Sequence, residues 1–185
     1  QWAEKPKPKT DRKEPEEGIE GEAEILLTYE LIALALQARQ TSVVSYRQPV
    51  ASVIKSMGMN YDPHALSHYG GSPARTDANR LRDKKCTEML GKFIDILKRT
   101  KEADGSSLFD HTILSWGTNL RHGHMIKDVP AIVAGGGGRL KMGHSIVLPE
   151  EDTPLGNLWV TLLRQAGVQV NSFGSSTGVL PELLT

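Results

Sequence analysis

Three stretches of the chain place apolar residues at helical spacing. Between Glu20 and Gln40 the apolar residues surround most of a helix, so this helix is expected to be buried on more than one side. From roughly Arg75 to Lys101 an apolar stripe lies opposite a basic face, the pattern of a long amphipathic helix. A third helix is expected from about Leu155 to Gln165, because apolar positions recur there and Gly167 follows the last of them.

Short runs of β-branched and apolar residues predict strands between these helices. They are residues 41–46, 111–116 and 129–134, with a further edge strand at 145–148. Because such strands alternate with long helices, the sequence predicts an α/β layered fold with a mostly parallel sheet flanked by helices. Residues 48–73 are rich in Pro, Gly, Ser, Asn and His, so a long loop is expected there, either functional or poorly ordered.

Composition removes several classes of function. The chain has 22 Lys and Arg against 22 Asp and Glu, and only three Phe, three Trp and four Tyr, which disfavours nucleic acid as a partner. Its single cysteine, Cys86, excludes an intrachain disulfide and a Cys-rich zinc module. No apolar run is long enough for a transmembrane segment. Residues 1–19 are charged, contain Pro and have almost no apolar residues, so a disordered or surface-draped lead-in is expected there.

One short run carries a family resemblance. HALSHY, from His64 to Tyr69, nearly matches the H-x-x-S-H-H signature and departs from it at Tyr69. Segments 112–117, 128–138 and 171–178 match in the same order, the last being preceded by a match at 153–158. On these segments the chain resembles the bacterial HXXSHH family, whose members have no established biochemical function. The resemblance covers about residues 20–180.

That resemblance implies an exported protein, periplasmic or extracellular, of which this chain is the C-terminal half. Residues 20–185 would then be the C-terminal part of a larger α/β domain, with the N-terminal half or another subunit as partner. The family is distantly similar to the alkaline phosphatase and sulfatase superfamily, which implies an alkaline-phosphatase-like half. In that superfamily a comparable strand ends in adjacent Asp and His metal ligands, whereas here Gly117, Thr118 and Asn119 follow the strand.

Four histidines are the candidate metal ligands. His64 and His68 are four residues apart, which on a helical turn places both imidazoles on one face. His122 and His124 flank a glycine just after a predicted strand, where open α/β sheets place ligands. If both loops leave neighbouring parallel strands, the two pairs should meet at one sheet edge. Neutral imidazoles would suit zinc or a similar divalent transition metal. The alternative is that these histidines only pack within ordered loops or are incidental.

Two functions remain open at this stage. One is a metal-assisted hydrolase of phosphate or sulfate esters, and the other is a non-catalytic binding or assembly protein that retains an alkaline-phosphatase-like core. The run from Gly135 to Gly138 superficially suggests phosphate binding. A dinucleotide fingerprint requires a helix that begins directly at the glycines, and the sequence predicts none there. A tight structural crossing of the backbone is therefore the favoured interpretation.

Overall fold

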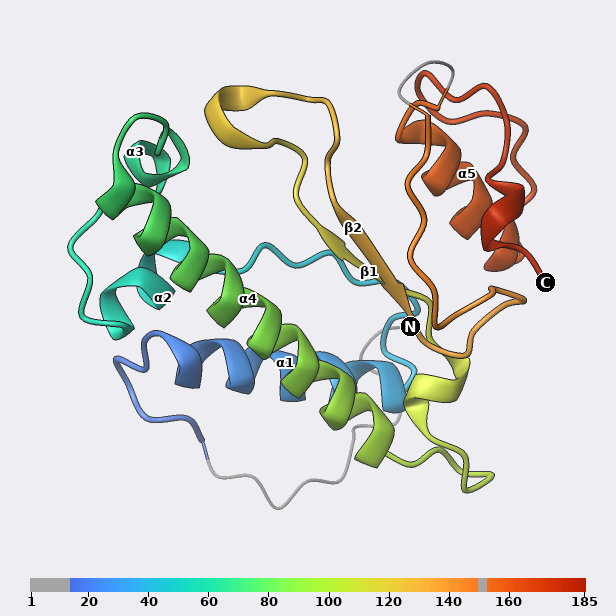
Figure 1. Cartoon of the computed structure of the whole chain (residues 1–185). Coiled ribbons are helices and arrows are strands. Elements are labelled where there is room, and N and C mark those ends of the chain that lie inside the picture. The colour runs from blue at the N-terminus through green and yellow to red at the C-terminus, as the bar shows by residue number, and fades with distance from the viewer. Residues whose placement is uncertain (1–13, 150–152) are drawn as a thin grey trace. The chain divides into compact units, whose positions relative to one another are not determined.

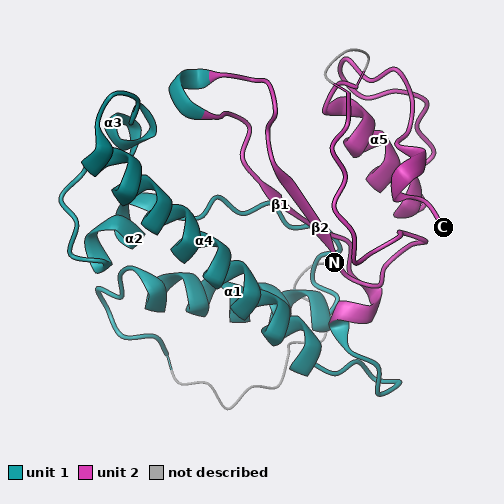
Figure 2. Ribbon diagram, in the orientation of Figure 1, with its two compact units in different colours: residues 1–108, 122–124 teal, residues 109–121, 125–185 magenta. Residues whose placement is uncertain are grey.

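The computed structural model describes residues 14–149 and 153–185. These residues form two units (Figure 2). Unit 1 contains the described residues up to Leu108 together with His122–His124, and unit 2 contains Phe109–Arg121 and the described residues from Met125 onward. Residues 14–20 form a turn without helix or strand, and residues 1–13 of the expected lead-in lie outside the described part of the chain.

Unit 1 is helical and contains α1 (Glu22–Gln37), α2 (Val50–Ser56), α3 (Pro63–Ser67) and α4 (Pro73–Arg99) (Figure 1). The two long helices predicted from the sequence are confirmed. Successive turns of α1 bury Ile25, Tyr29 and Ala33, and the Tyr29 ring stacks on Phe93 of α4 at a centroid distance of 4.4 Å. This contact between α1 and α4 provides much of the interior of unit 1. The further partner expected for α1 stays a prediction.

The expectation of a loop over residues 48–73 is wrong, because α2 and α3 lie there. Both helices are too short to be stable alone, so they depend on tertiary contacts, and they are too short to show a periodic apolar pattern in the sequence. Ile54 of α2, Leu66 of α3 and Ala78 of α4 are buried together, with Val50 and Met59 against them. Three helices thus share one small apolar cluster.

Unit 2 combines a β-hairpin with one helix. Strands β1 (Leu114–Gly117) and β2 (Ala131–Ala134) pair antiparallel, with Leu114 opposite Ala134 and Gly117 opposite Ala131. Helix α5 (Gly156–Gln165) is close to its predicted position. Its Leu158 and Leu162 are buried with Leu180, and Ile113 and Val133 from the sheet segments pack against them. Short 3₁₀ turns occupy Leu108–His111 and Pro181–Leu183, whereas His122–His124 form a turn of unit 1 with left-handed backbone at Gly123.

The predicted fold class is therefore wrong. In the described residues the sheet has two antiparallel strands, in place of the parallel sheet flanked by helices that was expected as an alkaline-phosphatase-like half. The reason is visible at residues 41–46 and 145–148, where no strand forms. Val43 is 82% exposed and Val147 is 94% exposed. Their β-branched side chains favour strands, but that preference depends on a paired and half-buried surface, which neither segment has.

The glycine run is a close backbone crossing, as the sequence predicted. A Cβ on Gly135 would lie 1.9 Å from the Thr112 carbonyl oxygen, and one on Gly136 would lie 2.6 Å from that of Asp110. The Gly136 amide donates to the Phe109 carbonyl at 2.9 Å, and the Gly137 amide donates to the Thr112 carbonyl at 3.1 Å. These amides are engaged within unit 2, which argues against a phosphate cradle.

Segments 153–158 and 171–178 of unit 2 meet through a buried asparagine, Asn157. Oδ1 of Asn157 accepts hydrogen bonds from the amides of Thr177 at 2.7 Å and Gly178 at 3.2 Å. Nδ2 of Asn157 donates to the Thr177 hydroxyl at 3.1 Å. One turn later, the Thr161 hydroxyl donates to the Asn157 carbonyl and accepts from the Leu180 amide. We call Asn157 and Thr161 the polar clamp of α5.

Within the described residues, no helix has the length and apolar character needed to cross a bilayer.

Candidate metal centre

Helix α3 carries His64, and His68 is the residue that caps its C-terminus. The Asp62 carboxylate caps this helix by accepting from the Ala65 amide at 2.8 Å, and Pro63 occupies its first turn. Leu66 is completely buried and fixes the inner side of α3 on unit 1. Since His64 and His68 lie two residues on either side of Leu66, both leave the helix away from the core. The cap and one apolar anchor thus determine where these imidazoles lie.

The third ligand comes from the loop between β1 and β2. Gly123 has φ 61° and His124 has φ 68°, so two successive residues adopt left-handed backbone. Glycine adopts this conformation without strain, whereas for a histidine it costs roughly 1–2 kcal/mol. Such strain persists only where surrounding contacts maintain it, and it is concentrated at functional positions.

His64, His68 and His124 form one group, which we call the histidine trio. Their potential ligand atoms all lie within 4.8 Å of one another. The Nε2 atoms of His68 and His124 are 3.2 Å apart, and the three ring centroids are separated by 4.6 to 5.1 Å. Two nitrogens on a tetrahedral zinc are ~3.4 Å apart when each Zn–N bond is ~2.1 Å. The predicted approach of the two loops is confirmed, although the parallel sheet expected to produce it is not present.

Three nitrogen donors are available at the trio. In the described part of the chain, no cysteine, aspartate or glutamate joins the group. Three histidines with a free fourth position are one of the donor sets found in catalytic zinc sites, whereas structural zinc sites have four protein ligands. A metal bound by the trio would therefore retain at least one position for water or another ligand.

The fourth candidate, His122, has a different contact. Its Nε2 accepts a hydrogen bond from the Gly70 amide at 2.9 Å, and its ring lies against Tyr69 at a centroid distance of 4.6 Å. His122 is therefore not one of the grouped ligands. Sequence reasoning treated the four histidines alike and missed Gly70 and Tyr69. The signal that could have found Gly70 is the Gly70-Gly71 pair directly after the histidine motif.

The electrostatics of the trio favour the neutral imidazole. Desolvation, followed by the nearby His124, His64 and His122, lowers the pKa of His68 below its ordinary value of 6.5. A positive charge on one ring disfavours a positive charge on the next. Metal ions bind the unprotonated ring, so this shift keeps His68 in its ligating form near neutral pH.

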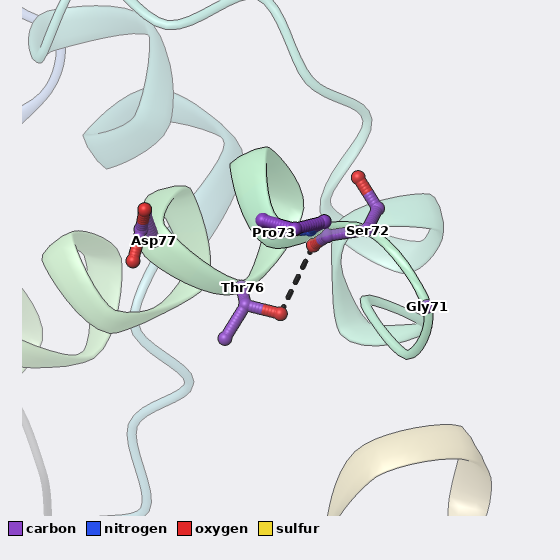
Figure 3. A pocket seen from close by; sticks show the side chains of 5 residues that line it. All are labelled: Gly71, Ser72, Pro73, Thr76 and Asp77. Atoms are coloured by element: carbon purple, nitrogen blue, oxygen red, sulfur yellow. Dashed lines mark hydrogen bonds between the residues drawn. The ribbon is translucent and has the colours of Figure 1, made fainter.

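The trio lies on an open surface. His64 and His124 are exposed, and His68 is half-buried. A nearby stretch of chain, Gly71 to Asp77, lines an open hollow of about 410 Å³ at the first turn of α4 (Figure 3). The polar groups there serve the helix, since the Thr76 hydroxyl donates to the Ser72 carbonyl at 3.0 Å and Ser72 Oγ accepts from the Arg75 amide. None of the three histidines lines this hollow.

No protein-family model matches the chain, and neither the curated proteins nor the solved structures contain a significant match. The resemblance to the HXXSHH family, together with the export and the missing half that it implies, therefore stays a prediction.

Proposed function

We propose that unit 1 binds one divalent transition metal, with zinc as the favoured ion, through His64, His68 and His124. The observation that carries this proposal is the convergence of three imidazoles from two distant segments, with two Nε2 atoms 3.2 Å apart. The left-handed backbone at His124 supports it, because that strained residue presents one of the three rings.

A hydrogen-bonded pair of neutral imidazoles is the main alternative at the same distance. In that case one Nε2–H of His68 or His124 donates to the other ring, and no metal is involved. The third ring distinguishes the two explanations, because a pair of hydrogen-bonded imidazoles does not require His64. If the three rings bind a metal, replacing His64 should weaken metal binding. If His68 and His124 are only hydrogen-bonded to each other, replacing His64 should leave that pair intact.

The test is metal binding by the full chain. Elemental analysis and zinc titration should give one ion per chain. Replacing His64, His68 or His124 by Ala should each reduce affinity by more than the roughly 10–100-fold typical of outer-shell losses. His144→Ala, an exposed histidine of unit 2, is the matched control and should bind like the wild type. A wild-type chain that takes up no zinc, cobalt, nickel or copper contradicts the proposal.

Ester hydrolysis is the second candidate function. It is favoured by the three-nitrogen donor set, which leaves room for a metal-bound water. A bound metal would supply a hydroxide near neutral pH and polarise the ester oxygen. Chromogenic phosphate and sulfate esters, assayed with the zinc-loaded wild type and with His68→Ala, test this activity. Stoichiometric zinc binding without turnover would favour the non-catalytic binding protein, which the exposed position of the trio also supports, because catalytic sites are usually concave.

A further inference from the structure

The contact between His122 and the chain after α3 indicates a role distinct from metal ligation. A neutral imidazole has one accepting and one donating nitrogen. Because Nε2 of His122 accepts from the Gly70 amide at 2.9 Å, Nδ1 carries the proton. Neither nitrogen then has a lone pair free for a metal.

We propose that His122 is a positioning residue, which holds the loop 122–124 on Gly70 so that His124 reaches His64 and His68. This inference rests on the proposed function for its effect on metal affinity, but the contact itself can be tested without metal. His122 and His124 are separated only by Gly123, so fixing one ring restricts the position of the other.

Three local features support this role. A Cβ on Gly70 would lie 2.8 Å from both Cε1 and Nε2 of His122, so the ring occupies the space of a missing side chain. The Tyr69 ring lies against the His122 ring with an interplanar angle of 57°. The Arg121 amide also donates to the Met125 carbonyl at 2.7 Å, which closes the loop at its base. Tyr69 is the position where the chain departs from the H-x-x-S-H-H signature, and here it contacts the loop rather than the trio.

Preorganisation explains why this contact would matter. A ligand that is already in place loses less conformational freedom when the metal binds. Residues that orient metal ligands without touching the metal typically contribute 10–100-fold to metal affinity. His122 and Gly70 should therefore affect affinity while the number of metal-bound nitrogens stays at three.

The experiment compares four variants of the full chain by zinc titration and by the absorption spectrum of bound cobalt. His122→Ala and Gly70→Ala should each lower affinity by about 10–100-fold, with one ion still bound per chain. His122→Gln retains an acceptor that can reach the Gly70 amide and should recover part of the affinity. Gly91→Ala adds a Cβ with nothing within 4 Å and is the matched control for Gly70→Ala.

Two outcomes overturn the inference. One is wild-type affinity in His122→Ala, and the other is a cobalt spectrum showing that His122→Ala has lost a metal-bound nitrogen, which would make His122 a ligand. If the wild type binds no metal, the proposed function fails, and imidazole NMR of the metal-free chain decides the positioning role. The His122 ring should then be protonated at Nδ1, and His122→Ala should shift the His124 signals. Unchanged His124 signals overturn the inference in that case as well.

Discussion

The histidine trio of unit 1 and the glycine-rich and Asn-containing segments of unit 2 are both dense in residues typical of functional sites, yet their polar atoms have different partners. In unit 2 the amides of Gly136 and Gly137 and the Oδ1 atom of Asn157 bind backbone groups of the same unit. In unit 1 the ring nitrogens of His68 and His124 face each other. A polar atom engaged with the backbone maintains the fold, whereas three imidazoles that converge on one another are close enough together to hold a metal ion.

The same difference separates the two histidines of the loop 122–124. His122 resembles Asn157, because it accepts from a backbone amide and fixes a segment. His124 belongs to the trio. The two residues are of the same type, so the residue type does not distinguish them. The partner of each ring nitrogen distinguishes them.

The largest effect is expected at the glycine crossing of unit 2. Gly135→Ala would place a Cβ 1.9 Å from a backbone carbonyl, at a φ of +102°. The clash is with backbone atoms, which cannot move away as the end of a flexible side chain could, so unit 2 should lose more than about 4 kcal/mol of stability. Denaturant unfolding followed by tryptophan fluorescence measures this, because Trp116 and Trp159 both lie in unit 2.

Gly143→Ala is the control, since it has a φ of +80° with nothing within 4 Å of the added Cβ. It isolates the backbone strain, about 1 kcal/mol. Equal effects of the two substitutions would show that the close crossing contributes nothing beyond strain.

The polar clamp should give the next largest effect. Asn157 is 5% exposed, and Asn157→Ala leaves the amides of Thr177 and Gly178 without their acceptor. We expect a loss of about 3 kcal/mol for unit 2, because Asn157 makes three part-buried hydrogen bonds and each contributes about 0.5–1.5 kcal/mol. Asn171→Ala, an exposed asparagine in the adjoining segment, should change stability by less than about 0.5 kcal/mol. A similar loss in both variants would contradict a specific role of the clamp.

Sequence periodicity was sufficient to locate α1, α4 and α5, because each extends over several turns and buries a continuous apolar face. It could not locate α2 and α3. Five or seven residues are too few for a periodic signal, and α3 depends on Leu66 meeting Ile54 and Ala78 from other helices. The parallel sheet was predicted from β-branched runs, two of which have no partner strand.

The candidate site was predicted more accurately than the fold that carries it. His64, His68 and His124 do converge, but the cause is α3 and a left-handed turn rather than a shared sheet edge. The spacing within each motif limits which rings can meet locally. The distance between motifs depends on tertiary packing, which one-dimensional periodicity does not contain. For this reason His122 could not be separated from His124 by sequence alone.

Zinc should stabilise unit 1 selectively. A ligand that binds only the folded state at 100 times its dissociation constant adds about 2.7 kcal/mol. We expect amide hydrogen exchange to slow in α3 and in the first turns of α4, with no change in α5. His68→Ala should abolish this protection. Equal slowing in α5 would mean that the ion acts on the whole chain and would remove the distinction between the two units.

The last effect is confined to alkaline pH and comes from Tyr29, a buried residue of unit 1 that is not part of the trio. Desolvation, together with the nearby Tyr46 and Cys86, raises the pKa of Tyr29 from 10.0 to about 12. In the unfolded chain this hydroxyl ionises near 10, so the unfolded state loses its proton first as the pH rises. The contribution of Tyr29 to stability is therefore complete below pH 10 and is lost between about pH 10 and 12, with a slope of at most about 1.4 kcal/mol per pH unit.

Tyr29→Phe retains the stacking on Phe93 and should reduce the loss of stability of unit 1 at alkaline pH. Hydrogen exchange of α1 and α4, or circular dichroism, measures this loss. Tyr61→Phe, at a more exposed position, is the control and should behave like the wild type. If both variants lose stability over this range as steeply as the wild type, burial of the Tyr29 hydroxyl does not govern the alkaline transition of unit 1.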